Sequence, residues 1–173
     1  NVGGKLAGSL LRNGIDLTIY DLDDARVADF VSRGAKAGTG PAAMMDACDT
    51  VITCLPSPAA SAAVVEGPGG VLEAVGPGKT WLEMSTTDAD EIKRLAEKVV
   101  AKGGKAADVP VSGGCHRAAT GNISIFAGCD RDTFETVLPL LTILGRRVLH
   151  TGPVGSASIL KVMTNYLATA NLL

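Results

Sequence analysis

Short apolar segments alternate with amphipathic segments along almost the whole chain, and this alternation restricts the fold more than any other feature. Runs of strand length are followed by patterns in which apolar residues recur every three or four positions. Expected strands cover 15–20, 50–55, 79–84, 105–109, 123–127 and 146–149, and expected helices cover 5–13, 23–33, 41–47, 59–65, 71–75, 88–102, 132–144 and 155–173. This order predicts an α/β fold, namely a Rossmann-like, doubly wound, mostly parallel sheet.

The pattern changes after Val154, where a long apolar-rich helix begins at Gly155 and runs to Leu173. Its apolar positions are expected to form a broad buried face, one side of which has no partner in this sequence. These positions are Ile159, Leu160, Met163, Tyr166 and Leu167. We therefore predict that residues 1–152 form one domain, and that 153–173 form the first, interdomain helix of an all-α domain whose remainder is absent.

Composition excludes several classes of protein. The chain is 46% hydrophobic and 20% charged, as globular proteins are, and its net charge of −2 with no basic run argues against nucleic-acid binding. No apolar stretch is long enough to span a membrane and no signal peptide is present, so we expect a cytoplasmic protein, or a mitochondrial matrix protein in a eukaryote. The four cysteines form no C-x-x-C pair and there are only two histidines, so no metal site is predicted.

The amino end carries part of a dinucleotide-binding pattern. Of the three glycines in G-x-G-x-x-G only the third can be present, as Gly3, so the first strand and two glycines are expected to precede Asn1. Asn1, Val2 and Gly3 open the first helix and are expected to bind the cofactor. Asp21 lies 18 residues after Gly3, where a ribose-binding acid belongs, and its charge favours NAD over NADP. Alternatively, Gly3 is only a small residue at a helix start and Asp21 a turn residue.

Two further segments follow expected strands of the sheet, at whose carboxyl ends ligands bind in folds of this type. Leu55 and Pro56 would line the nicotinamide side of the crevice, or would only end a strand. In Ser85-Thr86-Thr87 one hydroxyl is expected to cap the following helix and another to point into the crevice.

The Gly-rich loop expected over 112–121 has the composition of an anion site. Ser112 lies beside Gly113 and Gly114, so a hydroxyl and exposed backbone N–H groups are available for a small carboxylate. The alternative is an ordinary Gly-rich turn.

Lys161 and Asn165 are four residues apart and share one face of the last helix, in apolar surroundings. The lysine either extends to solvent or is desolvated, which would lower its pKa into a range suited to proton transfer. Asn165 would then hold a substrate oxygen or fix the lysine.

Two motifs together carry a family resemblance: Asp-x-Pro-Val-Ser-Gly-Gly at 108–114, followed by Ala119-x-Gly121, and Gly-x5-Lys-x3-Asn at 155–165. With them the chain resembles the β-hydroxyacid dehydrogenase family, and most closely its 3-hydroxyisobutyrate-oxidising members. The resemblance implies NAD-dependent oxidation of a small β-hydroxyacid to its semialdehyde, in a protein that is a homo-oligomer. It implies the following roles: Lys161 as acid/base, Asn165 positioning substrate, Ser112, Gly113 and Gly114 holding the substrate carboxylate, Leu55, Pro56 and Thr86 contacting the cofactor, and Asp21 as in NAD-using members.

The chain also departs from the family pattern. Ala60 stands where an Asn is common, Glu83 where an Asp is usual, and Cys115-His116-Arg117 where small residues are commoner. This leaves the substrate open: His116 would face solvent or contact a larger, more acidic substrate. Two alternatives remain, a glyoxylate or succinic semialdehyde reductase that prefers NADPH, whose Asn-Arg is here Tyr20-Asp21, and a non-catalytic dinucleotide-binding scaffold, whose members lack the lysine.

Overall fold

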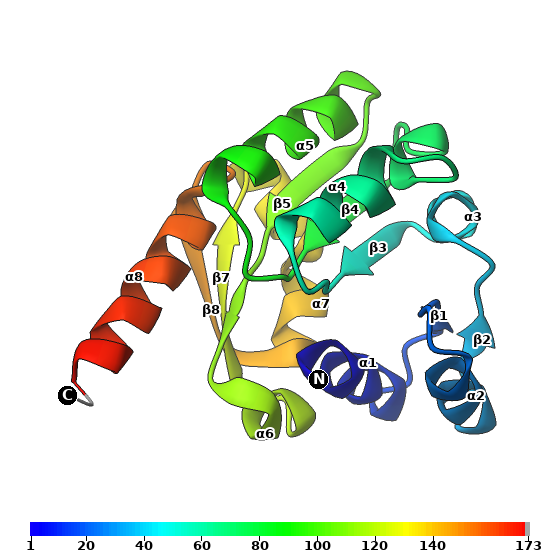
Figure 1. The fold of residues 1–173 in the computed structure, drawn as a ribbon, viewed down its shortest axis with the longest axis horizontal. Coiled ribbons are helices and arrows are strands. Elements are labelled where there is room, and N and C mark those ends of the chain that lie inside the picture. The colour runs from blue at the N-terminus through cyan, green and yellow to red at the C-terminus, as the bar shows by residue number, and fades with distance from the viewer. Residues whose placement is uncertain (172–173) are drawn as a thin grey trace.

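The computed structural model describes residues 1–171 and consists of a central sheet with helices on both faces (Figure 1). The elements, in chain order, are α1 (Val2–Arg12), β1 (Thr18–Ile19), α2 (Asp24–Ser32), β2 (Lys36–Ala37), α3 (Pro41–Ala47), β3 (Thr50–Thr53), α4 (Pro58–Glu66), the 3-10 helix η1 (Val71–Glu73), β4 (Thr80–Glu83), α5 (Ala89–Ala101), β5 (Lys105–Asp108), β6 (Val111–Ser112), α6 (Gly114–Ala119), β7 (Ile123–Gly128), α7 (Arg131–Leu144), β8 (Gly145–Gly152) and α8 (Ser156–Ala170).

The sheet confirms the predicted Rossmann-like, mostly parallel fold. Strands β3, β4 and β5 pair in parallel, and β8 pairs in parallel with β7. The antiparallel exception is β7, which pairs with β5 and with the short β6 that follows β5 along the chain. Strands β1 and β2 form a separate parallel pair. The carboxyl ends of β3, β4 and β5 therefore lie along one edge, which is where a ligand is expected in such a sheet.

Both faces of the sheet are covered by apolar cores. Trp81 and Leu82 are consecutive on β4 and point to opposite faces, yet both are fully buried. Leu82 belongs to the core built with α1, α6 and α7, and Trp81 to the core built with α3, α4 and α5. This two-sided burial explains why the central strands lack an alternating pattern.

Two expectations about elements were wrong in detail. The segment 112–121 is not a loop throughout, because β6 pairs with β7 and α6 buries Ala118 against the core. The first expected strand shrinks to Thr18–Ile19, since its only sheet partner is the two-residue β2, a strand that the sequence pattern did not indicate. The flanking glycines had obscured α6.

The expected apolar face of α8 is not covered within residues 1–171. Ile159, Met163, Tyr166 and Leu167 are each at least half exposed, whereas Ala157, Ser158 and Lys161 are buried. The physical reason lies at Gly128 on β7, where a Cβ atom, if one were present, would lie 2.8–3.2 Å from atoms of Pro153, Ser156 and Ala157. The helix thus meets the sheet through its small residues. The end of the expected helix, residues 172–173, lies outside the described residues.

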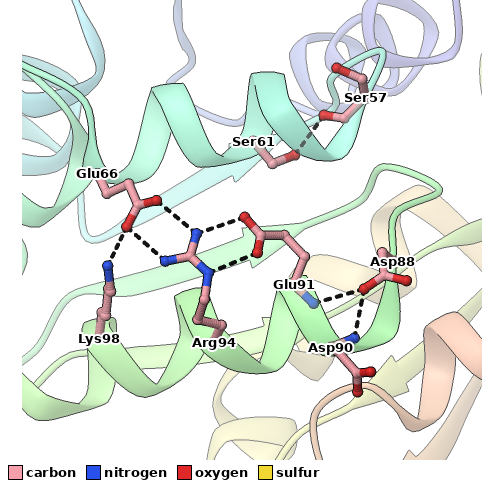
Figure 2. A network of polar contacts seen from close by, with 8 residues as sticks. All are labelled: Ser57, Ser61, Glu66, Asp88, Asp90, Glu91, Arg94 and Lys98. Atoms are coloured by element: carbon pink, nitrogen blue, oxygen red, sulfur yellow. Dashed lines mark hydrogen bonds and ion pairs between the residues drawn. The ribbon is translucent and has the colours of Figure 1, made fainter.

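Helices α4 and α5 are joined by a network of ion pairs on the protein surface (Figure 2). Arg94 on α5 binds Glu66 at the end of α4 at 2.7 Å and Glu91 on its own helix at 2.7 Å, and Lys98 also pairs with Glu66. The hydrogen bonds from Arg94 and Lys98 lower the pKa of Glu66 from 4.5 to about 2. Among the helices of residues 1–171, none combines the length and the apolar character that crossing a bilayer requires.

Replacing Arg94 by Met is expected to raise the pKa of Glu66 from about 2 toward 4.5. A lowered folded-state pKa stabilises the fold only while the carboxyl is ionised. The melting temperature of R94M should therefore fall below that of the natural protein above pH 4.5, and the difference should vanish as the pH falls toward 2. Carboxyl ¹³C NMR titration and thermal unfolding measure both quantities. Lys93→Met, which removes only the pair with Asp90, is the control; a Glu66 that titrates near 4.5 in the natural protein would contradict the expectation.

Candidate active site

The predicted cofactor residues at the amino end and after β3 lie together. A Cβ placed on Gly3, in the first turn of α1, would lie 3.1 Å from the Cβ of Cys54, which follows β3. This is the close helix–strand approach that the third glycine of a dinucleotide-binding turn permits. The residues after it, Leu55 and Pro56, are tied to the next strand, because the Leu55 N–H donates to the Ser85 hydroxyl at 2.6 Å. The residues at this edge therefore fit a nicotinamide dinucleotide.

One of the two roles expected of the hydroxyls of 85–87 is contradicted by the structure. The helix cap that was expected from one of them is provided by Asp88, whose carboxylate accepts from the N–H groups of Asp90 and Glu91 at 3.0 Å. Ser85 is buried and holds Leu55, and Thr86 is exposed at the sheet edge. The Thr87 hydroxyl is buried and has no hydrogen-bond partner within residues 1–171. The carboxylate of the next residue, Asp88, takes the place of the hydroxyls because it satisfies two N–H groups at once.

Glu83, at the end of β4, places a carboxyl group in the interior. Its Oε1 accepts from the Ser85 N–H at 2.9 Å, while Oε2 has no partner in the described part of the chain. Burial raises the pKa of this carboxyl. The side chain is one methylene longer than the Asp common at this position, and it supports the turn that holds Leu55 through Ser85.

Asp21 lies two residues after β1, with its side chain 40% exposed. One carboxylate oxygen accepts from the Asp23 N–H at 3.0 Å, and the other lies 3.6 Å from the guanidinium of Arg26. Asp23 caps α2, as the sequence predicts, and also pairs with Arg26 at 3.0 Å. The carboxylate of Asp21 is thus oriented by its own turn and still reaches solvent.

Asp108, at the end of β5, fixes the start of α8. Its fully buried carboxylate accepts three hydrogen bonds, from the N–H of Gly155 at 3.1 Å, from the N–H of Ser158 at 2.9 Å and from the Ser158 hydroxyl at 2.8 Å. The first N–H groups of a helix lack partners within the helix, and an anion there also faces the positive end of the helix dipole. Burial raises the pKa of this carboxyl, and the hydrogen bonds oppose the rise.

Lys161 lies one turn after Ser158, on the buried side of α8. The residue is 8% exposed, and its Nζ donates to Oδ1 of Asn165 at 2.9 Å. Burial lowers the pKa of the Lys161 amine. Of the two fates that the sequence left open, the structure shows a desolvated lysine, whereas Asn165 itself is exposed. Such a pair can accept and return a proton next to a polar oxygen.

The Ser112–Gly114 segment follows β5, the strand whose last residue, Asp108, binds the start of α8. Only Val109 and Pro110 separate β5 from β6, and Ser112 pairs with Ser124 on β7. Gly113 and Gly114 have φ angles of 132° and 78°, which L-residues with side chains rarely adopt. Within residues 1–171 no hydrogen bond joins this segment to Lys161 or Asn165. The Ser112–Gly114 segment and the Lys161–Asn165 pair are connected through the end of β5 at Asp108.

Residues 1–152 match the model of the NAD binding domain of 6-phosphogluconate dehydrogenase. The chain belongs to the β-hydroxyacid dehydrogenase family. It is 32% identical over 171 residues to 2-(hydroxymethyl)glutarate dehydrogenase of Eubacterium barkeri, and the aligned region covers 99% of this chain and 57% of that protein. It is 32% identical over 166 residues to glyoxylate/succinic semialdehyde reductase 1 of Arabidopsis thaliana, covering 96% of this chain and 57% of that protein. The chain thus spans little more than half the length of these relatives.

A solved dehydrogenase of the family has the same fold. The crystal structure of 3-hydroxyisobutyrate dehydrogenase from Salmonella typhimurium superposes with a TM-score of 0.89 at 25% identity, covering 96% of this chain and 59% of that one. The family resemblance and the fold expected from the sequence are thereby confirmed.

The sequence analysis missed residues that do not belong to the proposed site but hold its elements in position. Asp108 was part of a recognised motif without a role, and Ser158 and Gly128 were not singled out. A signal for Asp108 was present, since the acid lies at a strand end two residues before Pro110, and a proline cannot continue a regular ladder. Ser85 acts on Leu55 across two strands, a contact that no local pattern records.

Asp108→Ala is expected to lower the free energy of unfolding by about 3 kcal/mol, because buried donors of Gly155 and Ser158 lose their acceptor. Asp108→Asn should cost about 1 kcal/mol, since the amide oxygen can still accept from both backbone N–H groups. Urea unfolding measures both. Asp132→Ala, which removes an exposed pair with Lys105, serves as the control and should cost less than about 1 kcal/mol. Equal losses in D108A and D132A would show that Asp108 does not anchor the helix.

Proposed function

We propose that the protein catalyses NAD-dependent oxidation of a small β-hydroxyacid to its semialdehyde, and the reverse reduction. The observation that carries this proposal is the buried Lys161 amine paired with Asn165, on a helix fixed to the sheet edge by Asp108. Membership of a family that includes dehydrogenases and reductases supports it. We propose two parts, residues 1–152 for the cofactor and 153–173 as the first helix of an all-α domain, and the pair lies in the second part. We also propose that the protein is a homo-oligomer, as the family resemblance implies.

In the proposed reaction Lys161 is the acid/base. Its lowered pKa increases the fraction of neutral amine, which takes the proton of the substrate hydroxyl during oxidation and returns it during reduction. The amide oxygen of Asn165 accepts a hydrogen bond from the Lys161 amine. This contact fixes the orientation of the amine, and with it the direction of the nitrogen lone pair when the amine is neutral. The bound nicotinamide would supply the hydride acceptor. Asn165 is exposed and its amide N–H remains available for a substrate oxygen.

The carboxylate of the substrate is assigned to Ser112, Gly113 and Gly114. The hydroxyl of Ser112 and the N–H groups of the two glycines provide donors without a side chain that would block approach. Leu55, Pro56 and Thr86 would line the cofactor, with Asn1, Val2 and Gly3 at the start of α1. Holding both reactants in fixed positions would supply much of the rate.

We propose NAD as the cofactor because the exposed carboxylate of Asp21 can accept from ribose hydroxyls and would repel a 2′-phosphate. One observation favours the alternative, an NADPH-dependent glyoxylate or succinic semialdehyde reductase. The Arg26 guanidinium lies 3.6 Å from Asp21 and is 54% exposed, so it could reach a 2′-phosphate. Its pairing with both Asp21 and Asp23 balances its charge and favours NAD.

Lys161→Met, which keeps the length of the side chain but removes the amine, is expected to lower kcat by roughly 10²–10⁴-fold, the contribution of a positioned acid/base. The affinity for NAD should remain within about twofold, because the amine serves the substrate and not the dinucleotide. Steady-state kinetics and NAD titration of the complete gene product measure the two effects. Lys102→Met, at an exposed lysine after α5, is the control. Unchanged turnover in K161M would refute the role.

The ratio of kcat/KM with NAD to that with NADP should exceed about tenfold and should fall by at least that factor in Asp21→Ser, since one charge repulsion is worth more than about 1.4 kcal/mol at close range. Asp24→Ser, in the first turn of α2, is the matched control: it removes a nearby negative charge and leaves the proposed ribose-binding acid, Asp21, in place. A preference for NADP in the natural protein would favour the reductase alternative.

A further inference from the structure

An open, basic hollow lies beside the Ser112–Gly114 segment. It has a volume of about 620 Å³ and is lined by β6, α6, β7 and β8, including Ser112, Gly113 and the side chains of Arg117, Arg146 and Arg147. A second hollow of about 460 Å³ shares the three arginines and Ser124 and adds His116. No Asp or Glu lines either hollow, and within residues 1–171 none of the three guanidinium groups forms an ion pair.

A β-bulge brings two of the arginines to the same hollow. On a regular strand Arg146 and Arg147 would point to opposite faces. The pairing of β7 with β8 passes from Ile123–Gly145 to Ser124–Arg147, so Arg146 is an extra residue opposite no partner. A bulge redirects a side chain in this way, and both arginines line the hollow. Placing two like charges side by side is unfavourable unless an anion compensates them.

Two lining residues of the hollow, Ser124 and Phe126, lie on the face of the sheet against which α8 packs. On β7, Ile123 and Ile125 point into the core shared with α7, so Ser124, Phe126 and Gly128 point to the opposite face. Gly128 is where α8 packs, since a Cβ there would meet Ser156 and Ala157. Phe126 and the half-exposed Leu149, which pair with each other two residues beyond Ser124 and Arg147, give the hollow an apolar wall beside the arginines. Figure 1 shows α6 at the lower ends of β7 and β8, and α8 running beside β8.

We propose that this hollow binds a second anionic group of the substrate. The inference rests on the proposed function: with one carboxylate held at Ser112–Gly114, a short carbon chain would pass over Ser124, which pairs with both Ser112 and Arg147, and would end in a carboxylate or phosphate at Arg117, Arg146 and Arg147. Arginine guanidinium groups bind either anion through paired N–H donors. The protein would therefore prefer a hydroxyacid with two acidic groups to one with a single carboxylate.

The kinetic test compares two substrates that differ by one terminal CH2–COO⁻ group, 2-(hydroxymethyl)glutarate and 3-hydroxyisobutyrate, with the complete gene product. The proposal predicts a KM at least about tenfold lower for the dicarboxylate, the worth of one charge-assisted hydrogen bond. In the double variant Arg146→Met/Arg147→Met that advantage should disappear, while the KM for 3-hydroxyisobutyrate stays within about twofold. Arg33→Met/Arg131→Met removes the same net charge elsewhere and should change neither KM. Equal KM values for the two substrates, or equal effects of R146M/R147M on both, would overturn the proposal.

A binding measurement separates this inference from the proposed function. Calorimetric titration with glutarate, which has two carboxylates but no hydroxyl to oxidise, should show binding that R146M/R147M weakens at least about tenfold. If the arginines also accept phosphate, glycerol 3-phosphate should compete with glutarate for the site. Glutarate binding without turnover of any hydroxyacid would leave the anion site standing and the proposed reaction refuted. Turnover of 3-hydroxyisobutyrate without glutarate binding would refute the anion site alone.

Discussion

The carboxylate of Asp108 connects the carboxyl end of β5 to the first turn of α8, and the arrangement of the candidate site depends on it. A buried carboxylate is costly unless its oxygens are satisfied, and here three donors satisfy it. The same strand continues after two residues into Val111 and Ser112 of β6. One strand end therefore sets both the position of the helix that carries Lys161 and the position of the proposed carboxylate-binding segment.

The second constraint on α8 is the absence of a side chain at Gly128. Without a Cβ there, the helix backbone approaches β7 closely, and small residues such as Ala157 occupy the contact. A larger residue at 128 would push the helix away from the sheet and uncover the lysine. The pattern is the reverse of an ordinary amphipathic helix: Lys161 is on the buried side, and large apolar side chains such as Tyr166 are on the exposed side.

The sequence predicted the α/β alternation because each central strand is buried on both faces and each helix on one, as at Trp81 and Leu82. It predicted the contact of Lys161 with Asn165 because a spacing of four fixes neighbours on a helix. It failed where packing overrides local pattern. The burial of α8 depends on a glycine in another element, and the direction of Arg146 depends on a bulge that only the strand register reveals.

The position of the anchor along α8 has a mechanical consequence. Helix residues rise about 1.5 Å each, so Lys161 lies about 4.5 Å from the pivot at Ser158, and Ala170 about 18 Å away. A tilt of about 5° would displace the lysine by only about 0.4 Å but the far end by about 1.6 Å. α8 can therefore act as a lever whose outer end follows whatever packs on it, while the amine close to the fulcrum keeps its place above the sheet.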